Sequence, residues 1–125
     1  MTESTRTFKR LGEGTYTCFL NRITTGTTKS GKPRTSFAFK VCDGEDKGEF
    51  VWDNVTCDTE IGMAVLVKKF NALAPDLGVP AIAPGDMASV ETVAKIVTDA
   101  AGSRRFKVRV TKNDKGFDKV YAEVL

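Results

Sequence analysis

The stretch Arg104-Arg105-Phe106-Lys107-Val108-Arg109-Val110 alternates strictly between charged and apolar side chains. A period of two is typical of a β-strand with one buried face, so the apolar residues should point into a core. The three cations Arg105, Lys107 and Arg109 then form a row on the opposite face, with no acid among them. Such a row is consistent with a solvated strand face and also with a surface that binds a polyanion.

A turn sequence and a second strand follow this stretch and complete a hairpin. Residues 112–116 contain the turn formers Asn, Asp and Gly, and residues 120–124 are again rich in strand formers. Lys112 and Lys115 lie in the turn. The hairpin is therefore expected to carry a cationic face and a basic tip.

Length and composition indicate one ordinary globular domain over residues 1–125, with residues 1–10 as a flexible arm. There is no run of 18 apolar residues and no secretory signal pattern at the N-terminus. The chain has three widely spaced cysteines and no histidine, which argues against a zinc site, a disulfide framework and a histidine-dependent catalytic triad. We therefore expect a cytoplasmic protein that is not an enzyme and needs no cofactor or metal.

Charge is distributed unevenly along the chain. Residues 1–41 carry eight basic and two acidic residues, whereas residues 42–63 carry one basic and seven acidic residues. Residues 104–125 are again basic, with a net charge of +4, although the whole chain has a net charge of only +3. This asymmetry suggests a polarised surface and a polyanionic partner.

The remaining pattern predicts a mainly β chain with a helical insert. Strands are expected at residues 14–23, 35–42 and 49–56, ahead of the C-terminal hairpin, and amphipathic helices at 59–74 and 87–100. Three consecutive strands, helices between strands 3 and 4, and a closing hairpin predict a five-stranded OB-fold barrel of the α+β class. The ligand face of that fold is flanked by two loops, here 24–34 and 112–118, and both contain Gly and Lys with Asp114 and Asp118 as their only acids.

Several short segments, taken in order, resemble those of the phage-encoded OB-fold single-stranded-DNA-binding proteins. The resemblance covers about residues 12–125. It includes a helix at 66–73 and a basic strand with a Gly116 turn. The segments that carry it are Gly12-Glu13-Gly14-Thr15-Tyr16, Lys29-Ser30-Gly31-Lys32, Phe37-Ala38-Phe39-Lys40-Val41, Asp43-Gly44-Glu45-Asp46-Lys47-Gly48 and Val51-Trp52-Asp53. The chain departs from that family in a longer proline-rich connection with a second helix, and in ending on the last strand without an acidic partner-recruiting tail.

The resemblance implies a protein that binds single-stranded DNA without chemistry, in the cytoplasm of the host cell and alongside proteins of replication or recombination. Single-strand binders combine a cationic groove with aromatic side chains on which bases stack. Phe37, Phe39 and Phe106 are assigned to the core because each alternates with polar neighbours. The candidate cations are Lys29, Lys32, Arg34, Lys40, Arg105, Lys107, Arg109, Lys112 and Lys115, and the candidate stacking residues are Trp52, Phe117 and Tyr121.

The sequence leaves open which face of its strand carries the Trp52 side chain. If Trp52 faces the core, Asp53 faces the groove. If Trp52 faces the groove, Asp53 must be buried, which is unfavourable without a partner. The cost of burying a carboxylate favours the core orientation for Trp52.

Other functions remain open at this stage. The same fold binds RNA and other polyanions, and the acidic segment 43–60 is a candidate contact of a protein-interaction module. An enzyme is a third alternative, in which Mg²⁺ would be held by Asp43, Glu45, Asp46, Asp53 and Asp58. No nucleophile–base pair is visible in the sequence to support it.

Overall fold

The computed structural model describes residues 11–83, 90–116 and 118–125. The expected arm at residues 1–10, the first residues of the expected second helix and Phe117 lie outside this range. The elements, in chain order, are β1 (Gly14–Thr27), β2 (Pro33–Val41), β3 (Phe50–Thr56), α1 (Glu60–Leu73), the 3-10 turn η1 (Pro75–Leu77), α2 (Val90–Ala101), β4 (Arg105–Lys112) and β5 (Asp118–Val124).

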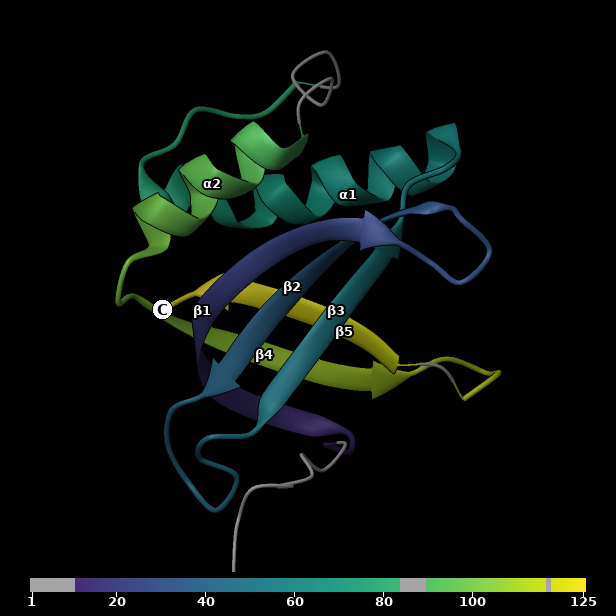
Figure 1. The fold of residues 1–125 in the computed structure, drawn as a ribbon. Coiled ribbons are helices and arrows are strands. Elements are labelled where there is room, and N and C mark those ends of the chain that lie inside the picture. The colour runs from purple at the N-terminus through teal and green to yellow at the C-terminus, as the bar shows by residue number, and fades with distance from the viewer. Residues whose placement is uncertain (1–10, 84–89, 117) are drawn as a thin grey trace, which may run out of the picture.

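The five strands form one antiparallel sheet in the order β3-β2-β1-β4-β5. The sheet is strongly curled, so that the β4–β5 hairpin crosses the β1–β2–β3 part at a steep angle (Figure 1). The expected mainly β, α+β class with two helices between the third and fourth strands is confirmed. The sheet is not closed into the expected five-stranded barrel, because no hydrogen-bonded ladder joins β3 to β5 in the described part of the chain.

Strand β1 holds the two parts of the sheet together. Its first half pairs with β4, from Gly14 to Phe19, and its second half pairs with β2, from Cys18 to Thr27. The register shifts between Leu20 and Arg22, and such a bulge bends a strand and increases its twist. The strand is also longer than the sequence pattern suggested, so the loop that follows it is shorter than the expected 24–34.

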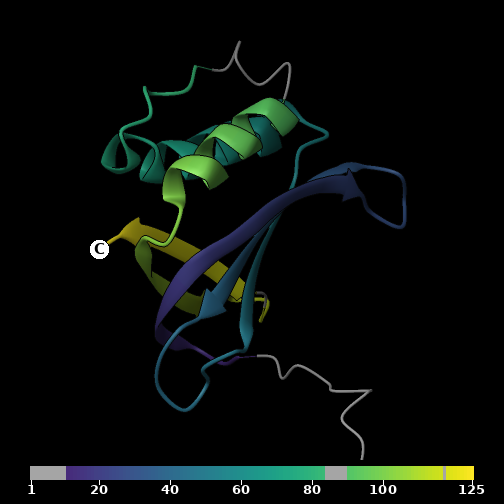
Figure 2. The same ribbon diagram turned by 60° about the vertical axis from the view of Figure 1, so that its left-hand side comes forward.

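The core lies between the inner face of the curled sheet and the two helices. Phe37 and Phe39 from β2, Phe70 from α1 and Phe106 from β4 are fully buried, and neighbouring rings of this group lie 5.2–6.4 Å apart. The core assignment of Phe37, Phe39 and Phe106 is confirmed. Both helices cover the same end of the sheet (Figure 2), so the outer face of the sheet stays uncovered by helices.

Helix α1 begins at a close approach to the end of β3. The hydroxyl of Thr59 caps the helix by accepting a hydrogen bond of 3.0 Å from the backbone N–H of Gly62. A Cβ atom at Gly62 would collide with the carbonyl oxygen of Thr56. This glycine therefore lets α1 lie beside the β3 edge, which decides the shape of the gap between β3 and β5.

Candidate nucleic-acid interface

The outer face of β1, β2 and β3 carries cations and aromatic rings in neighbouring positions. Lys40 lies in register between Phe19 on β1 and Phe50 on β3. Paired residues of an antiparallel sheet project to the same face, so these three side chains share the outer surface. Two residues away from Lys40 on β2, and on the same face, Ala38 lies between Arg22 and Trp52.

Trp52 lies on this outer face and is 44% exposed. The core orientation that the sequence favoured is therefore wrong, and Val51 and Val55 fill the core positions of β3 instead. The side chain of Asp53 is largely buried, with 13% of its surface exposed, but the Nζ of Lys69 on α1 pairs with its carboxylate at 2.7 Å. This partner offsets part of the penalty on which the core orientation was argued.

Two arginines on the outer face, Arg22 and Arg105, lie close to aromatic rings. The guanidinium carbon of Arg22 is 6.0 Å from the ring centre of Trp52, which in turn stacks on Phe50 at 5.9 Å. Arg105 lies 6.0 Å from Phe19. Cation–π contacts of this kind hold each guanidinium against a ring. The outer face therefore offers flat apolar surface and positive charge together.

The cationic row on β4 is exposed as expected, since Arg105, Lys107 and Arg109 all face solvent. The row is less isolated than the sequence suggested, because Lys107 pairs with Glu123 of β5 at 3.4 Å. Arg109 lies 5.1 Å from the ring of Tyr121, which is 49% exposed. Tyr121 is thus available as an aromatic surface, and part of the charge of the row is compensated.

The two basic loops project on the right-hand side of Figure 1. In the β1–β2 loop, Lys29 is exposed and Lys32 lies 3.6 Å from Asp58. Arg34 is exposed at the start of β2. Lys112 at the end of β4 and Lys115 in the β4–β5 loop are exposed, and Phe117 lies outside the described residues.

A groove with a volume of about 650 Å³ runs between the edges of β3 and β5, beside α1. Lys69 crosses it, because its Nζ donates to Asp53 at 2.7 Å and to the carbonyl oxygen of Val120 at 3.0 Å. Burial raises the pKa of Asp53, and the charge and hydrogen bond of Lys69 offset part of that shift. Sequence reasoning missed this groove, since its lining comes from segments about fifty residues apart.

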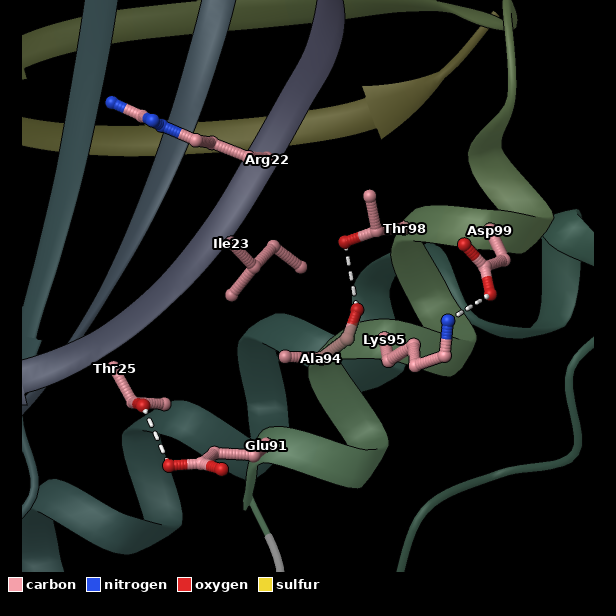
Figure 3. A pocket seen from close by; sticks show the side chains of 8 residues that line it. All are labelled: Arg22, Ile23, Thr25, Glu91, Ala94, Lys95, Thr98 and Asp99. Atoms are coloured by element: carbon pink, nitrogen blue, oxygen red, sulfur yellow. Dashed lines mark hydrogen bonds and ion pairs between the residues drawn. The ribbon is translucent and has the colours of Figure 1, made fainter.

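A smaller hollow lies between β1 and α2 and measures about 210 Å³ (Figure 3). Its polar groups pair with one another: Thr25 donates to Glu91 at 3.2 Å, and Lys95 lies 3.4 Å from Asp99. The side chain of Arg22 extends away from the helix, over the strands (Figure 3). The arrangement is that of a helix–strand contact with satisfied polar groups.

The acidic residues considered for Mg²⁺ do not gather at one place. Within the described ranges no group of three or more His, Cys, Asp or Glu side chains is arranged to hold a metal ion. Asp53 and Asp58 instead form ion pairs with Lys69 and Lys32. The acidic segment is thus partly neutralised within the molecule, which also weakens its case as a protein contact.

The three cysteines are free thiols. Burial, with smaller contributions from Cys42 and Asp43, raises the pKa of Cys18 to about 12, so this thiol stays protonated at neutral pH. None of the described helices is long and apolar enough to cross a membrane.

Comparison with known proteins places the chain in a family without assigning a function. The model of the family described as "Protein of unknown function (DUF669)" matches residues 2–125. No curated protein matches the chain. The chain belongs to the DUF669 family.

Proposed function

We propose that this DUF669 member is a single-stranded-DNA-binding protein of the OB type that binds largely without regard to sequence. The observation that carries the proposal is the exposed Trp52 on an outer face that also holds Arg22 and Lys40. Base stacking on aromatic rings and cations along the backbone are the two contributions on which such binders depend.

The topology supports an OB-type assignment. The order β3-β2-β1-β4-β5 is that of a five-stranded OB barrel that is open between its third and fifth strands, and the OB fold is a partly open barrel. Its oligonucleotide face lies on strands 2 and 3, between the loops that join strands 1–2 and 4–5. Trp52 and Lys40 lie on the corresponding strands here, Lys29, Lys32 and Lys115 lie in the corresponding loops, and Lys112 is the last residue of β4.

The physics favours single strands over duplex. A stacking ring needs an exposed base face, and the bases of a duplex are already stacked on each other. The function inferred is protection of single-stranded DNA during replication or recombination, in the cytoplasm of a host cell if the protein is encoded by a phage.

The test is a titration that follows the fluorescence of Trp52, the only tryptophan. Oligo-dT should quench the emission saturably, and a duplex of the same length should bind much more weakly. An oligo-U of the same length separates a DNA binder from an RNA binder. Equal affinity for single strand and duplex would contradict the proposal, because it would leave no role for base stacking.

A further inference from the structure

The groove between β3 and β5 combines an apolar floor with a basic rim. Phe37, Val55 and Leu73 contribute buried apolar surface to it. Lys68 of α1 and Lys119 of β5 line it and are exposed. Its volume of about 650 Å³ lies within the range of small-molecule sites.

The charge of the groove is positive because its one acid is already paired. Asp53 lies 2.7 Å from Lys69, so these two charges compensate each other. Neither Lys68 nor Lys119 is paired with an acid among the residues that the structure describes. An anionic ligand with a flat apolar part therefore matches both the rim and the floor.

The groove is continuous with the proposed binding face. Asn54 lines the groove and stands two residues from Trp52 on the same strand, so both side chains project to the same side of β3. Tyr121 forms part of the opposite wall and is 49% exposed, with Arg109 5.1 Å from its ring. A single strand of DNA that stacks on Trp52 can therefore pass over the β3 edge towards Tyr121.

We propose that this groove binds one nucleotide of a single strand, with the base against Tyr121 and the phosphate at Lys68 and Lys119. The proposal rests on the single-strand function proposed above and extends its site beyond the sheet face. It means that β5 and α1 are part of the binding surface, and that the unclosed edge of the sheet is used for binding.

A protein segment is the other occupant to consider, since an extended peptide can add to an exposed strand edge. Lys69 already donates to the carbonyl oxygen of Val120, one of the acceptors that such a peptide would need on β5. The positive rim also favours a phosphate. The nucleotide is therefore the occupant that the contacts support.

Photo-crosslinking locates the strand directly on the wild-type protein. Oligo-dT carrying 5-bromouracil at successive positions is irradiated in the complex, and the tryptic peptides are mapped by mass spectrometry. Tyr121 lies in peptide 120–125 and Trp52 in peptide 48–68, and fragmentation of each crosslinked peptide identifies the residue attached. Crosslinks to both Trp52 and Tyr121 are expected. Crosslinks to Trp52 with none to Tyr121 overturn the groove proposal and leave the single-strand function standing.

A charge experiment gives an independent readout. The double variant Lys68→Ala/Lys119→Ala is compared with Lys47→Ala/Lys95→Ala, which removes two exposed lysines from outside the groove. Each neutralised phosphate contributes about 0.7 to the log–log salt slope on single strands, and the groove is proposed to hold one, so the slope of the groove variant should fall in magnitude by about 0.7. The control should keep the wild-type slope. Equal slopes in the two variants overturn the groove proposal, whereas absence of binding and quenching in the wild type overturns both proposals.

Discussion

Trp52 faces solvent because its neighbour on β3, Asp53, has a cation within reach. Adjacent residues of a strand point to opposite faces, so exposing the indole requires burying the carboxylate. A buried carboxylate is tolerated when it is paired and hydrogen-bonded, and Lys69 supplies both contacts at 2.7 Å. The position of a helix residue sixteen places along the chain thus decides the direction of a strand side chain.

Replacing Trp52 by Ala should weaken single-strand binding by about 1–3 kcal/mol, the usual value of one base–aromatic stack. Because the side chain is 44% exposed, the loss of stability should be well below the about 3–5 kcal/mol of a core Trp→Ala change. Fluorescence anisotropy of a labelled oligo-dT measures the affinity, and thermal melting measures the stability. Trp52→Phe is the control that keeps a ring. Unchanged affinity with a core-sized loss of stability would return Trp52 to a packing role.

Asp53 should make the protein less stable as the pH rises. Burial raises its pKa above the ordinary value of 3.8, and Lys69 only partly opposes this. The stabilising contribution of the neutral acid is complete below the unfolded-state pKa and is lost as the pH rises through the raised folded-state pKa. The free energy of unfolding of the wild type, relative to Asp53→Asn, should therefore fall over that interval in urea titrations.

The matched control for this pH series is Asp99→Asn, whose side chain is 67% exposed. It reports the effect of removing a surface carboxylate. A wild-type-minus-Asp53→Asn difference that rises with pH would mean that Lys69 more than compensates for burial. The sign of the slope thus decides which of the two physical effects is larger.

At the scale of elements, the strands and helices follow from local pattern. Strict alternation in residues 105–110 and at Phe37 and Phe39 identified strands with one buried face. The first helix begins after Thr59, which caps it, and ends before Pro75, which cannot continue it. The length of β1 was underestimated, because the threonines and glycine of residues 24–27 resemble a loop. Their pairing with β2 comes from tertiary structure.

Gly62 should be intolerant of a side chain although it lies in a helix. Gly→Ala in an open helical position stabilises by up to about 1 kcal/mol, but here the new Cβ would meet the Thr56 carbonyl oxygen. Overpacking of this kind costs about 1–3 kcal/mol, so Gly62→Ala should lower the melting temperature. Gly26→Ala in strand β1, where a Cβ would have no atom within 4 Å, is the control for a methyl group added in open space and should not lower the melting temperature. A stabilised Gly62→Ala protein would show that α1 can move away from β3.

At the scale of the whole molecule, the helices and the outer face of the sheet have different roles. Both helices close one end of the core (Figure 1). The outer face of the sheet, which no helix covers, carries the exposed cations and rings. The distribution of charge along the sequence predicted which cations form the basic surface. It did not show which of these cations form ion pairs with acidic side chains. Glu123 beside Lys107 and Asp58 beside Lys32 are pairs that only the sheet register and the helix start bring together. The groove was missed for the same reason, since Lys68 and Lys119 meet only in the folded chain.

Salt dependence tests the path of the strand across the whole surface. If about four to six phosphates are neutralised, the log–log slope on oligo-dT should be roughly −3 to −4, from about −0.7 per contact. Lys40→Ala should reduce its magnitude by about 0.7, because Lys40 lies in register between Phe19 and Phe50 on the proposed face.

Lys107→Ala should reduce the magnitude of the salt slope by less than Lys40→Ala does. Lys107 already pairs with Glu123 at 3.4 Å, and it stands on β4, away from β2 and β3. Filter binding at four or more salt concentrations measures both slopes, and equal melting temperatures would show that neither change disturbs the fold. Equal losses in the two variants would mean that the strand crosses β4 as well. The exposed row that Lys107 shares with Arg105 and Arg109 would then belong to the contact surface, and the path over β3 towards Tyr121 would no longer account for all the phosphates bound.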